Sequence, residues 1–172
     1  VFKTGLITPI KELSDLAHRH GMLILADSAH GIGMINLNLT ATGVDCWASS
    51  PYKWLGAPAG SGVFYIRRDV QDRIWPTIAT GGWDTYKDAR RFETLSQRSD
   101  ALIMGLGEAI EFQNHIGRPR IERRIQTLAG RLKEGLASIP KVRLHTNTDK
   151  ELSSGLTAFS IAGMAGEDVV NH

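Results

Sequence analysis

The sequence predicts an α/β fold, and three observations support this prediction. Residues 8–21 (TPIKELSDLAHRHG) place apolar side chains at helical spacing. The run that follows, MLILAD (22–27), is short and apolar and has polar residues after it, which is typical of a strand buried in a parallel sheet. Two further strand-like runs come later, VDCWASS (44–50) and GVFYIRR (62–68). This order of helix, strand, loop and strand indicates a layered α/β architecture.

The first helix has recognisable ends. Thr8 is suited to cap it, Pro9 suits the first helical position, and Gly21 ends it. The face of this helix that we expect to be buried comprises Ile10, Leu13, Leu16 and Ala17.

Two more helices are predicted in the second half of the chain. Apolar residues recur at helical spacing in residues 102–116 and again in residues 121–139, and Pro119 between them predicts a break. The second pattern predicts a buried face made of Ile121, Ile125, Leu128, Leu132, Leu136 and Ile139. The later run SSGLTAFSIAG (153–163) indicates another strand. We therefore predict one domain over residues 1–117, and over residues 118–172 a connecting helix and the start of a second, smaller domain.

Composition narrows the classes of protein that fit. The 172 residues are 42% hydrophobic, and 20 basic against 18 acidic side chains give a net charge of +2, which provides no argument for a nucleic-acid or membrane partner. A single cysteine, Cys46, excludes an internal disulfide framework and fits a reducing compartment. No apolar run approaches the ~20 residues that span a bilayer. We expect a soluble cytoplasmic protein, of which this chain, opening without an initiator Met, is an internal piece.

Two candidate ligand-binding residues follow the first predicted strand. Asp27 lies where that strand ends, and ligands of parallel sheets bind at the carboxyl ends of the strands. The alternative is that Asp27 only caps the following turn. His30, three residues later, either contacts the same ligand or is a structural histidine. His18 and His20 have no partners that would make a metal site, and we predict none.

A lysine follows the second predicted strand. Lys53 lies in SSPYKWLGAPAGSG (49–62), and a parallel arrangement of the strands brings it to the same edge as Asp27. A desolvated lysine can lose its proton and attack a carbonyl carbon to form a Schiff base. The alternative is a surface lysine with a solvated amine.

The neighbours of Lys53 suit a phosphate. Ser50 and Tyr52 offer hydroxyl groups, and the glycines at positions 56, 60 and 62 would let the backbone approach a ligand closely. The nucleotide-binding patterns G-x-x-x-x-G-K-[ST] and strand-G-x-G-x-x-G are absent, which argues against a Rossmann-type nucleotide site. An acid, an amine and phosphate donors are the groups that pyridoxal 5′-phosphate requires, since its protonated ring acts as an electron sink.

These motifs resemble a known family. ADSAHGIG (26–33) and the stretch around Lys53 are similar to the class V aminotransferases among fold-type I pyridoxal-phosphate enzymes, which include cysteine desulfurases and isopenicillin-N-epimerase-like proteins. The resemblance covers nearly all of the chain. It implies a mostly parallel sheet with helices on both faces, of which residues 1–117 form the C-terminal part of the large cofactor-binding domain.

The resemblance also implies roles for individual residues. Lys53 would form the internal aldimine, Asp27 would pair with the pyridinium nitrogen, and His30 would contact the phenolic oxygen of the cofactor. Ser50 matches a phosphate-binding serine. Tyr52 stands where many relatives carry His, and its hydroxyl remains a candidate phosphate ligand.

Two further positions point to a dimer. In RFETLSQ, relatives usually carry Gly-Thr, whose Thr reaches the partner's cofactor phosphate across an interface; here Leu95-Ser96 keeps only the hydroxyl. Thr80 opens a Thr-Gly-Gly loop near the same interface, although its glycines could also be a plain flexible connection. The resemblance therefore implies a homodimer with its active sites at the interface.

The reaction type is open within the family. The KWL element after Tyr52 is most similar to the epimerase-like branch, so we predict a transaminase- or epimerase-like enzyme acting on an amino acid or related amine. The alternatives are a cysteine desulfurase or carbon–sulfur lyase, and a non-catalytic α/β binding domain. We expect the 172 residues alone to be inactive.

Overall fold

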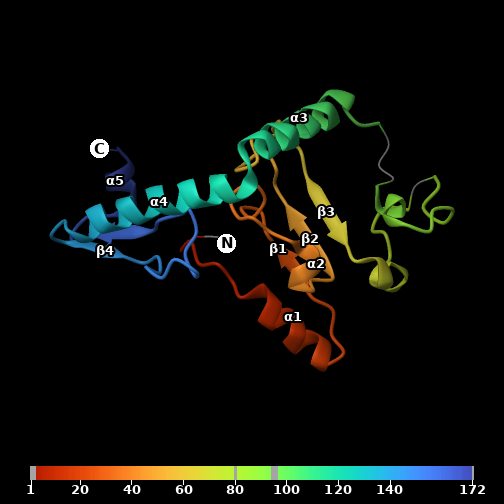
Figure 1. The fold of residues 1–172 in the computed structure, drawn as a ribbon, viewed down its shortest axis with the longest axis horizontal. Coiled ribbons are helices and arrows are strands. Elements are labelled where there is room, and N and C mark those ends of the chain that lie inside the picture. The colour runs from red at the N-terminus through yellow and green to blue at the C-terminus, as the bar shows by residue number, and fades with distance from the viewer. Residues whose placement is uncertain (1–2, 80, 94–96, 172) are drawn as a thin grey trace.

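The computed structural model describes residues 3–79, 81–93 and 97–171 (Figure 1). In chain order the elements are α1 (Ile10–Arg19), β1 (Leu25–Asp27), α2 (Leu39–Thr42), β2 (Cys46–Ser49), β3 (Val63–Ile66), the 3₁₀ helices η1 (Arg68–Arg73) and η2 (Ala89–Phe92), α3 (Asp100–Ile116), α4 (Arg118–Ala137), β4 (Val142–Leu144), β5 (Phe159–Ile161) and α5 (Gly166–Asn171). The predicted α/β class is confirmed.

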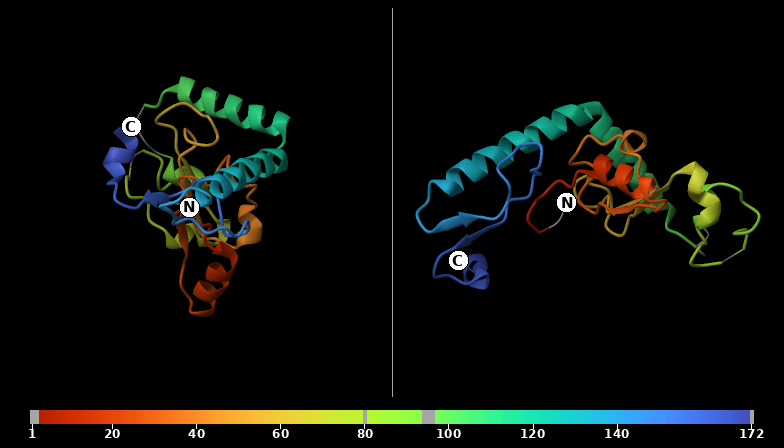
Figure 2. Two further views of the ribbon diagram at one scale, coloured as in Figure 1. Left: turned by 90° about the vertical axis from the view of Figure 1, so that its left-hand side faces the viewer. Right: turned by 90° about the horizontal axis from the view of Figure 1, so that it is seen from below.

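Within the described residues, the larger sheet has the order β1-β2-β3. Strands β1 and β2 are parallel, with Asp27 opposite Ala48, and β3 runs antiparallel to β2, with Val63 opposite Ser49. The strands lie between α3 and α1 (Figures 1 and 2). Because β1 and β2 are parallel, their carboxyl ends share one edge of the sheet, and the predicted ligand-binding residues follow from that edge.

Helix α1 differs from its prediction at the start and on its buried face. It begins at Ile10, and Pro9 is the N-cap residue with no side-chain cap hydrogen bond, so Thr8 is not the cap. Leu13 is 38% exposed, and the fully buried residue of the helix is Ser14, whose hydroxyl donates to Ile10 O at 2.8 Å. Two residues of the predicted apolar face, Ile10 and Leu13, border a cavity beside β1.

Helices α3 and α4 meet at a break, as predicted. Gly117 between them has φ +94°, and Pro119 lies in the first turn of α4, where its missing N–H leaves no hydrogen bond unmade. The predicted buried face of α4 is wrong in part. Leu128 and Leu132 are 47% and 51% exposed, whereas the buried residues of this helix are Ala129 and Lys133.

The second part of the chain contains a small two-stranded sheet packed on α4. In this sheet β4 pairs antiparallel with β5. The beginning of the chain joins this region, because Leu6 forms an antiparallel bridge with Ser153. The domain boundary after residue 117 stays a prediction.

A buried charge holds the amino end of β2. The side chain of Asp45 is 0% exposed and lies 2.9 Å from His18 Nε2 and 2.9 Å from an Arg67 guanidinium nitrogen. The Ile24 N–H also donates to it at 2.8 Å. Burial would raise the pKa of Asp45, but the Ile24 N–H, His18 and Arg67 together lower it. This network ties α1 and the segments beside β1 and β3 to β2.

The structure also bears on the membrane question. Among the residues that it describes, no helix is long and apolar enough to cross a bilayer.

Candidate active site

The carboxyl ends of β1 and β2 are fixed to each other by hydrogen bonds. Ser28 N donates to Ala48 O at 2.8 Å, and Ser49 Oγ donates to Ser28 O at 2.7 Å. Asp27, the last residue of β1, is exposed, and one of its carboxylate oxygens accepts from Ala29 N at 3.2 Å. Asp27 therefore caps the next turn, as the alternative interpretation expected, and still presents its carboxylate to solvent at this edge.

The structure brings Lys53 and His30 together. Lys53 Nζ lies 3.3 Å from His30 Nε2, although the two residues are 23 positions apart in the chain. On its other side, His30 Nδ1 accepts a hydrogen bond from Trp54 Nε1 at 3.1 Å. An indole N–H can only donate, so Nδ1 is the acceptor, and the neutral ring carries its proton on Nε2. This Nε2–H can donate to Lys53 Nζ only when the amine is uncharged, because an ammonium group has no acceptor.

The charges around His30 favour its neutral form. Burial lowers the pKa of His30, the positive charge of Lys53 lowers it further, and the negative charge of Asp27 acts in the opposite direction. Lys53 itself is exposed and forms no ion pair among the described residues. The arrangement presents an amine without a carboxylate partner beside a neutral imidazole.

The loop that carries Lys53 is held from two sides. Gln113 of α3 donates from Nε2 to Trp54 O at 2.8 Å, and Leu55 packs against Ala109 of the same helix. On the other side, Gly33 has φ +81°, and a Cβ there would lie 2.4 Å from Leu55 N. The turn after β1 and the loop after β2 thus touch at a position where only glycine fits.

The glycines that follow Lys53 face open space. Gly56, Gly60 and Gly62 were predicted to let the backbone approach a ligand, and a Cβ at any of them would meet nothing within 4 Å, so this stays a prediction. Gly56 and Gly60 are needed for their positive φ angles of +77° and +88°. Gly33 was not singled out, although it closes the Gly-x-Gly that directly follows His30, and this was an available signal.

The predicted phosphate ligands are only partly placed by the structure. Ser50 and Tyr52 lie in the turn that leads to Lys53, where Lys53 N donates to Ser50 O at 3.1 Å. Tyr52 is exposed, and Lys53 Nζ lies 6.0 Å from the centroid of its ring. The two remaining candidates, Thr80 and Ser96, lie outside the described residues.

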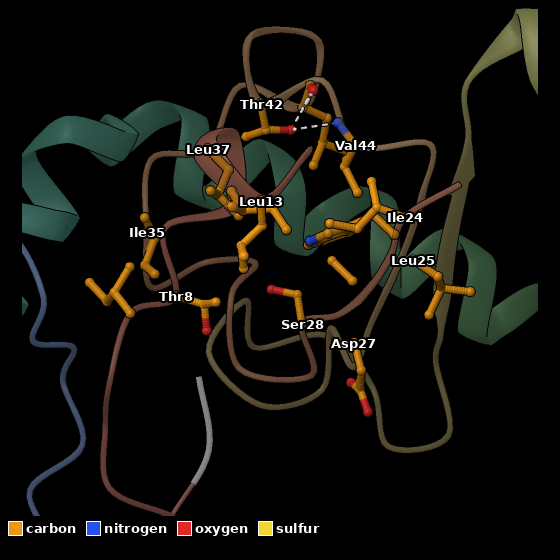
Figure 3. A pocket seen from close by; sticks show the side chains of 15 residues that line it. Thr8, Leu13, Ile24, Leu25, Asp27, Ser28, Ile35, Leu37, Thr42 and Val44 are labelled. Carbon is orange, nitrogen blue, oxygen red and sulfur yellow. Dashed lines mark hydrogen bonds between the residues drawn. The ribbon is translucent and has the colours of Figure 1, made fainter. Parts of the chain in front are cut away.

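A cavity of about 290 Å³ borders β1 but is not the site of the amine (Figure 3). Asp27 and Ser28 lie at its polar end, and most of its lining is apolar, including Leu13 and Ile24. Lys53 does not line it. Elsewhere in the described residues, no group of three or more His, Cys, Asp or Glu side chains is arranged to hold a metal ion.

Comparisons with known proteins agree on one family. The family model described as aminotransferase class-V matches residues 3–172. A probable cysteine desulfurase of Methanothermobacter thermautotrophicus is 29% identical over 173 residues, which are 96% of this chain and 43% of that protein. The isopenicillin N epimerase of Streptomyces clavuligerus is 28% identical over 176 residues, covering 94% of this chain and 44% of the epimerase.

The solved structures give the same picture. The apo structure of a cysteine desulfurase from Thermococcus onnurineus NA1 superimposes with a TM-score of 0.86 at 28% identity, covering 97% of this chain and 44% of that one. The chain therefore spans less than half the length of the relatives that it matches.

Proposed function

Because the chain belongs to the class V aminotransferase family, we propose that it forms part of the cofactor-binding domain of an enzyme that acts on an amino acid or a related amine. Membership confirms the resemblance that the motifs around Asp27 and Lys53 indicated, and with it the fold and pyridoxal phosphate as the cofactor of the family. The roles of individual residues in this chain are part of the proposal.

One observation carries the proposal: an exposed lysine amine without an ion pair in the described residues lies 3.3 Å from an imidazole nitrogen, at the edge where β1 and β2 end. An amine that is not held by a carboxylate can react with an aldehyde. The exposed carboxylate of Asp27 and the hydroxyls of Ser50 and Tyr52 supply the remaining donors and acceptors. These residues fit pyridoxal phosphate.

When bound, the cofactor supplies an aldehyde and an electron-withdrawing ring that stabilises a carbanion. Lys53 would hold the aldehyde and, once released, would take or return the proton at the substrate α-carbon. Asp27 would keep the ring nitrogen protonated by accepting its hydrogen bond. His30, with its proton on Nε2, would donate toward the phenolic oxygen, and Ser50, Tyr52, Thr80 and Ser96 would bind the phosphate.

For the reaction type we favour transaminase- or epimerase-like chemistry at an α-carbon, because the KWL element follows Tyr52 directly and an isopenicillin N epimerase is among the relatives. Desulfuration is the second candidate, and it is favoured by the relatives described as cysteine desulfurases. Cys46 of this chain is not a candidate nucleophile. It is 5% exposed within β2, and burial raises the pKa of its thiol.

The first test uses the full-length protein that contains this chain. Pyridoxal phosphate is added, the protein is reduced with borohydride and digested, and pyridoxyl-modified peptides are located by mass spectrometry. We expect modification at Lys53 and none there in Lys53→Ala. A Lys53 peptide that stays unmodified would leave the non-catalytic α/β domain as the better interpretation.

A second measurement separates the two reaction types. The loaded protein is incubated with a panel of amino acids in D₂O, and deuterium incorporation at the α-carbon is followed beside sulfide release from cysteine. Exchange without sulfide supports the epimerase- or transaminase-like proposal, and sulfide release supports desulfuration. A homodimer with sites at its interface and a cytoplasmic location remain part of the proposal, and size-exclusion chromatography with light scattering tests the former.

A further inference from the structure

A second cluster of polar groups, which includes none of the residues proposed to hold the cofactor, lies between α4 and the segment that precedes β5. Lys133 of α4 is 7% exposed, and its ammonium group donates to the hydroxyl of Ser153. Ser153 and the adjacent Ser154 are each 3% exposed. Their segment is held in place from the beginning of the chain, where Ser154 N donates to Gly5 O at 2.9 Å.

Lys133 is buried without an ion-pair partner among the described residues. The other deeply buried charged side chain, Asp45, has two cationic partners, whereas no carboxylate in the described residues forms an ion pair with Lys133. Burial lowers the pKa of Lys133. An ammonium group out of water is unfavourable unless an anion or several acceptors compensate it, so the position calls for a counter-charge.

The hydrogen bonds of the cluster leave donors in excess. Ser153 Oγ accepts from Lys133, and Ser154 Oγ accepts from Leu156 N at 3.2 Å. Each serine still has its own O–H to donate, and the ammonium has further N–H groups. Among the described residues, none accepts these remaining donors. A ligand that completes the cluster must therefore bring acceptors.

Room for such a ligand is present. A cavity of about 190 Å³ is lined by Lys133, Ser153 and Ser154, by the polar side chains of Gln126 and Thr148, and by small or apolar residues of α4 and β4. Lys150 and Glu134 also line it, and both are exposed. The carboxylate of Glu134 is in contact with water, which screens its charge, and it forms no ion pair with Lys133.

We propose that this cavity binds a small oxyanion, with the Lys133 ammonium and the Ser153 and Ser154 hydroxyls as its donors. A phosphate group and a carboxylate offer the same acceptor chemistry to these three donors. These donors are not among the residues proposed above to hold pyridoxal phosphate, and the proposal does not rest on that function.

The test measures binding of inorganic phosphate and, in a parallel arm, of acetate to the full-length protein at constant ionic strength. Titration calorimetry is carried out with excess pyridoxal phosphate present, so that any site for the cofactor phosphate is filled. We expect one of the two anions to bind the wild type. Lys133→Met should weaken that binding about tenfold or more, because a charge-assisted hydrogen bond is lost. Lys87→Met, the same change at an exposed lysine, should leave it unchanged.

Ser153→Ala provides a second variant whose folding does not depend on replacing a buried charge. It should weaken anion binding several-fold. Urea denaturation gives an independent readout: added anion should raise the midpoint of the wild type and not that of Lys133→Met. Failure of both anions to bind the wild type, or equal binding by the wild type and both variants, would overturn the proposal, whatever the borohydride experiment shows.

Discussion

The charged side chains at the two ends of strand β2 lie in opposite environments, one buried and paired, the other exposed. Directly before the strand, Asp45 is fully buried and bonded to His18, Ile24 N and Arg67. In the turn that follows the strand, Lys53 is exposed, has no ion pair in the described residues and lies 3.3 Å from His30.

The difference separates a structural charge from a reactive one. A buried carboxylate that is paired with cationic side chains stabilises the fold, because removing a partner leaves an uncompensated charge. An amine without a counter-ion contributes little to stability and remains available for chemistry. Substitutions at the two ends of β2 test this difference. A substitution at Lys53 should change function alone, and a substitution at Asp45 should change stability.

The largest expected effect belongs to Lys53→Ala. We expect turnover of the full-length protein to fall roughly 10³-fold or more, because the proposed cofactor anchor and proton-transfer group are both lost. The urea midpoint should not change, because the side chain is exposed. Deuterium exchange at the substrate α-carbon measures the turnover, and circular dichroism during urea denaturation measures the midpoint.

Lys11→Ala is the matched control, since Lys11 is an exposed lysine that pairs with Asp15. It should leave turnover unchanged. Near-native exchange by Lys53→Ala would contradict the assignment of Lys53.

Asp45→Asn should have the largest effect on stability. We expect a loss of about 3 kcal/mol, because the variant leaves His18 and Arg67 beside a neutral side chain. Urea denaturation of the full-length protein measures it, and Asp15→Asn, at an exposed ion pair, is the control that should hardly change the midpoint. Equal midpoints for the two variants would show that the network is not structural.

The pH dependence of this effect has a definite sign. The folded-state pKa of Asp45 is lowered, so the unfolded state binds more protons at acid pH. The contribution of Asp45 is complete above its ordinary value of about 3.9 and is lost as the pH falls through the lowered folded value. The difference in the free energy of unfolding between the wild type and Asp45→Asn should therefore become smaller as the pH falls below about 3.9.

The sequence could predict the parts of the site that follow from chain order. An acid and a lysine after two consecutive strand-like runs share one edge once the strands are parallel, and β1 and β2 are parallel. It could not predict which partners fill the space between them. The donation from Trp54 to His30 and the contact of Gly33 with Leu55 depend on how two loops fold onto each other, and neither has a periodic signal.

Helix faces were the other point at which the sequence was insufficient. Apolar spacing located α4, but Leu128 and Leu132 are about half exposed, while Lys133 is buried. Periodicity reports which residues share a face. It does not report which face meets a neighbour, because that is decided by the position of the 152–156 segment and the small sheet.

Trp54→Phe should have a smaller effect, and it tests whether the indole of Trp54 sets the tautomer of His30 beside Lys53. The variant removes the indole N–H that holds His30 Nδ1 as an acceptor. We expect the preference for the Nε2–H tautomer to fall by about 1 kcal/mol, or roughly fivefold. Long-range ¹⁵N–¹H NMR of the imidazole ring measures the tautomer ratio directly.

Trp75→Phe makes the same change at a tryptophan that is 71% exposed and packs on Trp83, and it should leave the His30 spectrum unchanged. An unaltered tautomer ratio in Trp54→Phe would mean that the indole does not orient the ring.

The smallest expected effect is on the titration of His30. Its folded pKa is lowered by burial first and by the charge of Lys53 second, so by NMR it should titrate below the ordinary value of about 6.5. Lys53→Met should move the pKa of His30 upward without restoring the ordinary value, because burial remains. Since the unfolded chain then binds more protons, the contribution of neutral His30 to stability is present above about pH 6.5 and is lost as the pH falls through the folded value. If Lys53→Met left the titration unchanged, the amine and the imidazole would not be coupled, and the lysine end of β2 would be an exposed surface without a site.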